Sequence, residues 1–191
     1  MNSKSEIRTK ILKKRLSLSS TKILESEKAL SLIWNEFQSR NLKVINKIGL
    51  YWPINNELST LRIIEDIIRQ KKSCYLPVID NKNEKNISFK NYVTSGILIK
   101  NKYGIPEPLH GEPIEINSLD LLIVPLVAFD MKGNRIGMGQ GFYDITLNKY
   151  KRLIPKLIGL GYDFQEEFTC FPENHDIKLD GALTPSRIIE F

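Results

Sequence analysis

Residues 121–150 read LLIVPLVAFDMKGNRIGMGQGFYDITLNKY, and this stretch decides the fold. It opens with the apolar run 121–129, whose composition is that of a strand buried on both faces, as in a parallel sheet. A glycine-rich loop follows, and the pattern then predicts a helix from about Phe142 to Tyr150. The stretch therefore predicts a buried strand that leads through a loop into a helix, as in α/β proteins with a parallel sheet.

The rest of the chain alternates between helical and strand patterns in the same way. Helices are expected over 5–15, from Ser19-Ser20-Thr21 to about residue 40, and from just before Ser59. Strands are expected over 45–52, 74–79, 87–92, 157–162 and 187–191, and 104–108 is expected to be a rigid extended loop. This alternation predicts a three-layer α/β sandwich with a mainly parallel central sheet, in a single domain over residues 1–191.

Length and charge limit the possibilities. The chain has 191 residues, which is enough for one α/β domain and too few for two ordinary ones. Its formal net charge of +6 favours anionic partners such as a nucleotide, a polyglutamate tail or a nucleic acid. Charge alone does not choose among these partners, and a solvated basic surface is equally consistent with it.

Cysteine usage and hydropathy indicate a cytoplasmic protein without a membrane partner. Cys74 and Cys170 stand in no CxxC pair and have no histidine at metal-ligand spacing, so they are expected to be reduced core thiols. Residues 1–6 lack the apolar region of a secretory signal. The longest apolar run, 121–129, is far shorter than the ~20 residues that a membrane helix needs.

The glycine-rich loop carries the pattern that points to chemistry. Gly137, Gly139 and Gly141 have no Cβ, so backbone N–H groups there can approach phosphate oxygens. The start of the following helix adds a partial positive charge to the same place. Arg135 offers a planar fork for phosphate, and Asp144 in the first helical turn is a suitable Mg²⁺ ligand. The loop therefore predicts a site for a phosphorylated ligand at the carboxyl end of the buried strand.

The glycines alone leave an alternative open, because a tight strand-to-helix connection needs them too. The loop is not a Walker A motif, since it lacks Gly-Lys-Ser/Thr, and it lacks the third glycine of the dinucleotide fingerprint at its usual spacing. Arg135 and Asp144 at its two ends favour the phosphate interpretation.

The same residues carry a family resemblance. Asn134-Arg135-Ile136-Gly137 and Gly141-Phe142-Tyr143-Asp144 resemble the signature loop of the 5-formyltetrahydrofolate cyclo-ligases. Four further segments resemble that family in order along nearly the whole chain: Lys4-Ser5-Glu6-Ile7-Arg8, Tyr51-Trp52-Pro53 with Glu57-Leu58, Ile105-Pro106-Glu107-Pro108 and His175-Asp176-Ile177-Lys178-Leu179-Asp180.

The resemblance implies an ATP-dependent ligase that binds Mg²⁺ and converts 5-formyltetrahydrofolate into 5,10-methenyltetrahydrofolate. It implies that Arg135 and Tyr143 are catalytic and that Asp144 and Asp180 bind the metal. It implies an ATP site formed by Lys4, Arg8, Arg135, Ile136, Gly137, Met138, Gly139, Gln140, Gly141, Phe142 and Tyr143. It implies a site for the folate, which can carry a polyglutamate tail, formed by Trp52, Glu57, Met138, Gly139, Gln140, Gly141 and Phe142.

Several of these residues also have purely structural interpretations. Lys4 and Arg8 are consistent with a solvated helix face. Trp52 is consistent with core packing, and Glu57 with an acid that faces a helix dipole. Asp180 precedes Gly181, which is a turn signal, and Tyr143 is consistent with a packed tyrosine.

Two positions depart from the family pattern, and two other functions compete. The family usually has an aromatic or basic residue at the position of Met138 and a glycine or lysine at that of Gln140, so substrate affinity is the property most affected. A nucleotide-binding paralogue with a different or lost activity would share this fold. A nucleic-acid-binding protein is disfavoured, because the basic residues are dispersed and no nucleic-acid-binding motif occurs. The sequence does not indicate an oligomeric state.

Overall fold

An eight-stranded sheet forms the centre of the protein, seen in a computed structural model that describes residues 3–40, 45–79, 86–150 and 153–191. The sheet has the strand order β12 (Ile188–Glu190), β11 (Gly181–Leu183), β10 (Lys156–Leu160), β7 (Leu121–Pro125), β1 (Lys47–Gly49), β2 (Ser73–Ile79), β3 (Ile87–Tyr92) and β6 (Pro113–Ile114). The strands from β11 to β2 run parallel, whereas β12, β3 and β6 pair antiparallel with their neighbours. The predicted α/β fold with a mainly parallel sheet is confirmed.

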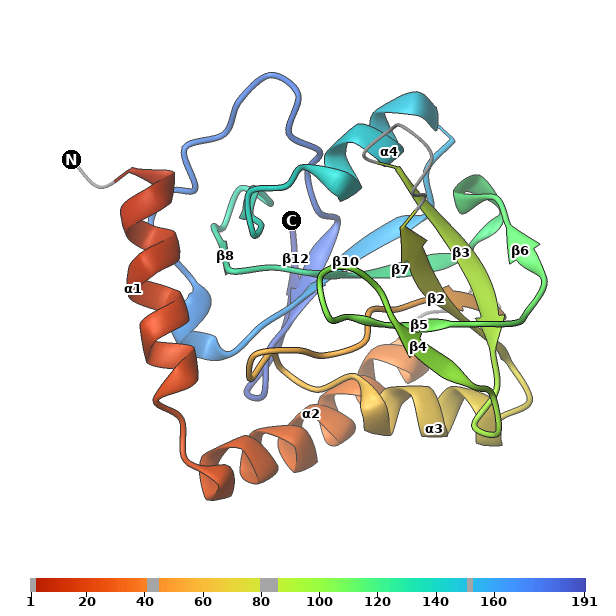
Figure 1. The fold of residues 1–191 in the computed structure, drawn as a ribbon. Coiled ribbons are helices and arrows are strands. Elements are labelled where there is room, and N and C mark those ends of the chain that lie inside the picture. Colours follow the sequence, from red (N-terminus) through yellow and green to blue (C-terminus); the bar gives the residue numbers. More distant parts are fainter. Residues whose placement is uncertain (1–2, 41–44, 80–85, 151–152) are drawn as a thin grey trace.

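Helices cover both faces of this sheet (Figure 1). On one face, α2 (Ser20–Arg40) and α3 (Leu61–Arg69) bury Trp34 and Ile67 in one cluster with Ile48 of β1. On the other face, α4 (Phe142–Tyr150) buries Leu147 with Phe89. The residues of β7 alternate between these two clusters, so the apolar composition of that strand follows from burial on both faces.

Asp66 joins the two helices of the first face. Its carboxylate accepts hydrogen bonds from Trp34 Nε1 and Gln38 Nε2 on α2, both at 3.0 Å, and from Gln70 Nε2 at 2.7 Å. A buried carboxylate is stable only when it is well hydrogen-bonded, and these contacts meet that condition.

The first helix, α1 (Lys4–Leu16), lies beside the sheet and not on its faces (Figure 1). A capping box starts it, in which Ser3 Oγ accepts from the Glu6 N–H and Glu6 accepts from the Ser3 N–H. Ile7 and Ile11 are buried against a small apolar cluster that includes Ile136. This packing places the basic start of α1 next to the glycine-rich loop.

The expected strand over 121–129 is wrong in its length. β7 ends at Pro125, which lacks an N–H for a further ladder bond. The carbonyls of Leu126 and Val127 instead accept from Gln165 Nε2, at 3.0 and 2.8 Å. The chain then enters a separate hairpin of β8 (Ala128–Phe129) and β9 (Arg135–Ile136). Apolar composition did not reveal this break, because residues on both sides of it are buried.

Smaller differences lie at element boundaries. α3 begins at Leu61, so Ser59 and Thr60 precede the helix. The expected extended loop contains β5 (Pro106–Pro108), which pairs with β4 (Leu98–Lys100). The strands β4, β6 and β11 have only two or three residues each and were not expected. The remaining short elements are the 3-10 helices Ile116–Ser118 and Asp163–Gln165. In the described part of the chain, every helix is too short or too polar to cross a bilayer.

Candidate active site

A pocket of about 660 Å³ opens where the parallel strands end. Tyr51 follows β1, Pro77 and Ile79 stand near the end of β2, and Pro125 ends β7, and all four line the pocket. In open α/β sheets, ligands bind outside the carboxyl ends of the strands. The volume lies within the range of small-molecule sites, so this pocket is the candidate active site.

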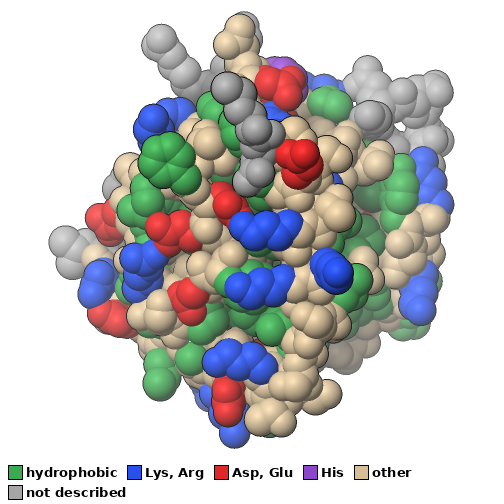
Figure 2. Space-filling model, turned by 90° about the vertical axis from the view of Figure 1, so that its left-hand side faces the viewer, with side chains coloured by type: hydrophobic (Ala, Val, Ile, Leu, Met, Phe, Trp, Pro, Cys, Tyr) green, Lys and Arg blue, Asp and Glu red, His purple; other side chains and the backbone are tan. Residues whose placement is uncertain are grey.

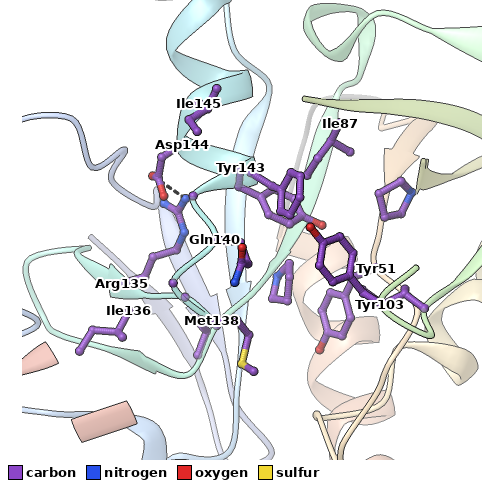
Figure 3. A pocket seen from close by; sticks show the side chains of 18 of the residues that line it. Tyr51, Ile87, Tyr103, Arg135, Ile136, Met138, Gln140, Tyr143, Asp144 and Ile145 are labelled. Carbon is purple, nitrogen blue, oxygen red and sulfur yellow. Dashed lines mark hydrogen bonds and ion pairs between the residues drawn. The ribbon is translucent and has the colours of Figure 1, made fainter. Parts of the chain in front are cut away.

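The glycine-rich loop forms one wall of the pocket, opposite a group of tyrosines (Figure 3). Asp130 fixes the hairpin that leads into this loop, because its carboxylate accepts from the N–H groups of Asn134 and Cys170 at 3.1 and 2.9 Å. Gly139 and Gly141 then adopt φ values of +92° and +74°, which residues with a Cβ rarely adopt. The loop thus leads directly into the first turn of α4.

Arg135 and Asp144 are held together at this wall (Figure 3). The buried Arg135 guanidinium donates from Nη2 to Asp144 Oδ1 at 2.7 Å and from Nη1 to the Ile177 carbonyl. Asp144 Oδ1 also accepts from the Ile177 N–H at 3.0 Å. A guanidinium and a carboxylate therefore face the pocket in a fixed relation, next to the start of a helix.

Lys4 and Arg8 reach the same wall from α1. Lys4 Nζ forms ion pairs with Glu173 Oε1 at 2.9 Å and with Asp176 Oδ2 at 2.7 Å. Burial alone would raise the pKa of Asp176, but the hydrogen bonds from Lys4 and the Glu173 N–H lower it. Arg8 Nε donates to the Gly137 carbonyl at 2.9 Å. Both cations line the pocket, so this face of α1 is not solely a solvated surface.

Trp52 and Glu57 line the pocket from the segment that follows β1. Trp52 is half-buried and its ring meets Tyr92 edge-on, with the centroids 6.0 Å apart, so it packs on the core and lines the pocket at once. Glu57 stands four residues before α3 begins, outside the first turn of that helix. Its Oε2 accepts from the Ile54 N–H at 3.1 Å, and its Oε1 lies 3.7 Å from Arg15 Nη2.

The Tyr143 hydroxyl group stays protonated near neutral pH. Burial raises its pKa well above the ordinary value, the charge of Glu57 raises it further, and Arg135 lowers it. Burial also raises the pKa of Tyr51, with a further contribution from Glu57. Both residues line the pocket, but the Tyr51 hydroxyl group donates to the Leu58 carbonyl, so of these two residues Tyr143 is the one proposed to offer a neutral hydroxyl group to a ligand.

The hairpin of β4 and β5 contributes an aromatic residue that sequence reasoning missed. Tyr103 lines the pocket and meets Phe142 edge-on, with the ring centroids 5.8 Å apart. Glu107 anchors this hairpin, because its Oε1 accepts from the Ile79 N–H at 2.9 Å and from Asn101 Nδ2 at 2.6 Å. Tyr103 directly precedes the Gly104–Pro108 segment, and this position beside a segment that resembles the family is the feature of the sequence that could have indicated its place in the site.

Asp180 is the one predicted site residue that the structure does not bring to the pocket. It immediately precedes β11, at the amino ends of the parallel strands, whereas the pocket lies at their carboxyl ends. Its Oδ2 accepts from the Leu157 N–H at 2.7 Å, which ties it to the start of β10. Asp144 and Asp180 therefore do not form one metal site here. Asp176, four residues earlier, lines the pocket.

The glycine-rich loop also contains the two positions that depart from the family pattern. Met138 and Gln140, which depart from the family pattern, are exposed residues that line the pocket. The described residues contain no cluster of three or more histidine, cysteine, aspartate or glutamate side chains that would hold a metal ion by itself.

The surface on the side of α1 carries both charges (Figure 2). Lysine and arginine side chains are interleaved there with aspartate and glutamate, and Lys10 Nζ pairs with Glu167 Oε1 at 2.7 Å. This mixture differs from the continuous basic surface that nucleic-acid-binding proteins present.

Comparisons with known proteins agree with one another. The sequence model of the 5-formyltetrahydrofolate cyclo-ligase family matches residues 1–185. The chain is 36% identical over 183 residues to a 5-formyltetrahydrofolate cyclo-ligase of Haemophilus influenzae, which covers 93% of this chain and 95% of that protein. It is also 36% identical over 146 residues to the enzyme of that name from Escherichia coli, covering 75% of this chain and 80% of that protein.

A solved structure extends the likeness to the fold. The 5,10-methenyltetrahydrofolate synthetase of Aquifex aeolicus superposes with a TM-score of 0.81 at 29% identity. The match covers 98% of this chain and 92% of that protein.

Proposed function

The chain belongs to the 5-formyltetrahydrofolate cyclo-ligase family, and from this premise we propose that it uses ATP to convert 5-formyltetrahydrofolate into 5,10-methenyltetrahydrofolate, with release of ADP and phosphate. One observation carries this proposal: a single pocket is lined both by the glycine-rich loop with Arg135 and Asp144 and by Glu57 with a group of aromatic rings. One part suits a polyphosphate and the other suits a flat, hydrogen-bonding ring system.

The reaction needs ATP because a formamide is unreactive. Resonance makes the formyl oxygen a poor leaving group. Transfer of the γ-phosphoryl group to that oxygen turns it into a phosphate ester, which leaves readily when the folate N10 attacks the carbon. The protein therefore has to place two substrates in line and stabilise the charge that develops on the transferred group.

The ATP side of the proposed site combines two sources of positive potential. Lys4 and Arg8 on α1 and Arg135 on β9 supply cations. The backbone of 136–143 and the start of α4 supply N–H groups for phosphate oxygens. Lys4 would exchange its carboxylate partners Glu173 and Asp176 for a phosphate when ATP binds.

The folate side lies between the strand ends and the β4–β5 hairpin. Glu57 would accept hydrogen bonds from ring N–H groups, and Trp52 and Phe142 would contact the faces of a flat ring, since all three line the pocket. Residues 138–142 also line the pocket, and we propose that they contact both substrates. We add Tyr103 to this side because its ring packs on Phe142.

Arg135 and Tyr143 are the proposed catalytic residues. The buried guanidinium of Arg135 is held by Asp144 and Ile177, so it would stabilise charge on the transferred phosphoryl group with little reorganisation. The neutral hydroxyl group of Tyr143 would donate a hydrogen bond to an oxygen of the reacting groups.

Mg²⁺ fits at Asp144. Both hydrogen bonds that the described residues make to this carboxylate end on Oδ1, which leaves Oδ2 for a cation. Mg²⁺ in nucleotide sites is usually held by one or two carboxylates together with substrate phosphates and water, so a larger protein cluster is not needed. When bound, the ion would neutralise phosphate charge. Asp180 is left out of this proposed site because of its position at the other end of the strands.

The proposal also covers the domain organisation, the location in the cell and the partners of the protein. We propose that residues 1–191 act as one domain in the cytoplasm, in keeping with the free, buried thiols of Cys74 and Cys170. We expect no nucleic-acid or membrane partner. A polyglutamate tail on the folate is compatible with the net charge of +6.

The rise of methenyltetrahydrofolate absorbance tests the function directly. Purified protein mixed with 5-formyltetrahydrofolate and MgATP should produce this absorbance, and omission of ATP should abolish it. Arg135→Met is the matched control for a contaminating enzyme, since it should lose turnover by orders of magnitude. ATP binding without any absorbance change would favour the alternative, a nucleotide-binding paralogue with another activity.

A further inference from the structure

Arg15 is a buried cation near the end of α1 that the proposed site does not use. Only 1% of its surface is exposed, and it is not among the residues that line the pocket. Its Nε donates to the Asn55 carbonyl at 2.9 Å, whereas Nη1 and Nη2 have no hydrogen-bond partner among the described residues. Burying a charge costs free energy unless nearby groups compensate for it, so the burial of this guanidinium needs an explanation.

The loop that carries Glu57 is attached to Arg15. Asn56 Nδ2 donates to the Arg15 carbonyl at 3.2 Å, in addition to the bond from Arg15 Nε to Asn55. Asn55 and Asn56 have φ values of 49° and 55°, a left-handed conformation that asparagine adopts more readily than most other residues with a Cβ, and the two hydrogen bonds to Arg15 hold this turn. The end of α1 therefore helps to fix the turn that leads into Glu57.

Arg15 also forms an ion pair with the Glu57 carboxylate, in which Arg15 Nη2 lies 3.7 Å from Glu57 Oε1. The Glu57 charge in turn raises the pKa of Tyr51 and of Tyr143, so both hydroxyl groups are neutral near physiological pH and neither supplies a charge that would replace Arg15. Burial raises the pKa of Glu57 above its ordinary value, and Arg15 and the Ile54 N–H offset only part of this rise. Without Arg15, burial would favour the protonated acid more strongly.

We propose that Arg15 is a positioning residue that fixes the turn carrying Glu57 and keeps the Glu57 carboxylate charged, so that it accepts hydrogen bonds from the folate ring. This inference rests on the proposed function, in which Glu57 contacts the folate. A protonated carboxyl group would present a donor where the ring presents N–H donors, so folate affinity would fall. Because Lys4 and Arg8 lie at the other end of α1, the effect should be confined to the folate side.

The pH dependence of kcat/KM for 5-formyltetrahydrofolate at saturating MgATP tests this role. In Arg15→Met, the acid limb should move to higher pH by about one unit or more, since a neighbouring opposite charge typically shifts a carboxyl by that amount. Arg15→Lys keeps the charge and should keep the limb near its wild-type position. The KM for ATP should stay within about twofold in both variants. A fall in kcat/KM that is equal at every pH would overturn the proposal and leave Arg15 a purely structural residue.

Titration of ¹³C-labelled glutamate by NMR in the ligand-free protein separates this proposal from the proposed function. The Glu57 signal, assigned by its loss in Glu57→Gln, should titrate at higher pH in Arg15→Met, whether or not the protein is a cyclo-ligase. Arg15→Gln serves as a second neutral variant if Arg15→Met does not fold. An unchanged Glu57 titration in a folded neutral variant contradicts the proposal even when the wild type is fully active.

Discussion

The Arg135 guanidinium and the Asp144 carboxylate are joined across 2.7 Å, and this contact ties the hairpin of β8 and β9 to the first turn of α4. The glycine-rich loop lies between these two residues in the sequence, so its ends are fixed relative to each other. Asp144 consequently has two proposed partners, a cation of the protein and a metal ion, and they differ in what its removal would change.

Replacing Asp144 distinguishes these partners. Asp144→Asn keeps the size of the side chain but loses the charge, and turnover should fall by orders of magnitude in a folded protein, because an Mg²⁺ clamp supplies several kcal/mol at the transition state. If Asp144 binds the metal, the Mg²⁺ concentration needed for half-maximal rate should also rise. If it only holds Arg135, kcat should fall without any change in the Mg²⁺ requirement. A variant within a few-fold of wild-type kcat at modest Mg²⁺ would refute the metal assignment.

Arg8 should act on ATP and not on the folate. Arg8→Ala would remove the proposed charge-assisted contact with a phosphate, which is typically worth ~1.5–3 kcal/mol, so the KM for ATP should rise roughly ten- to a hundredfold while the KM for folate changes little. Lys10→Ala is the matched control on the same helix, because Lys10 points away from the pocket and pairs with Glu167. Equal ATP dependence in the two variants would show that Arg8 contacts no phosphate, although it lines the pocket.

Replacing Gly137 tests the proposed phosphate-binding role of the loop without a folding effect. A Cβ built at Gly137 meets nothing within 4 Å, and its φ is not in the left-handed region, so Gly137→Ala should leave the thermal midpoint unchanged or slightly raised. If phosphate oxygens approach the backbone here, the KM for ATP should rise by roughly tenfold or more, as expected for a lost charge-assisted bond. Normal ATP kinetics in Gly137→Ala would show that no phosphate approaches this position.

The free energy of unfolding should depend on pH because the Asp66 carboxylate is charged and hydrogen-bonded in the folded state. Burial alone would raise its pKa, but hydrogen bonds from Arg69, Gln38 and Trp34 together lower it below the ordinary value of 3.8. A carboxyl group with a lowered pKa stabilises the folded state above the unfolded pKa, and this stabilisation is lost as the pH falls through the folded pKa.

Asp66→Asn should therefore lower the free energy of unfolding by about 1–3 kcal/mol at pH 7, and the difference from wild type should shrink below about pH 4. Urea unfolding at pH 7, 5 and 3 measures this. Glu65→Gln is the control, because Glu65 is exposed on the same helix and should cause no change. A difference that persists unchanged at pH 3 would mean that the charge of Asp66 is not what stabilises the helix pair.

The layers of the fold could be predicted because they follow from local patterns. The continuous apolar run of β7 reflects burial on both faces, and the apolar stripe of α3 reflects burial on one face, so each leaves a pattern in the sequence. Short elements leave no such pattern: β11 has three residues, and the end of β7 at Pro125 is hidden among apolar neighbours on both sides.

The site was predictable only where consecutive residues form it. The loop 135–144 combines Arg135, the glycines and Asp144 in one segment, whereas the pairing of Arg15 with Glu57 joins residues of separate elements. Asp176 and Asp180 stand four residues apart in one recognised segment, and only the tertiary fold decides that Asp176 reaches the pocket while Asp180 bonds to the start of β10.

The edge strands of the sheet bear on how copies of this chain can associate. β12 and β6 have three and two residues, so each edge exposes few backbone groups to a strand from another molecule. Pro113 in β6 has no N–H to donate at all. A second molecule would find little backbone to pair with at either edge of the eight-stranded sheet as the structure describes it, so these two edges disfavour association by strand addition.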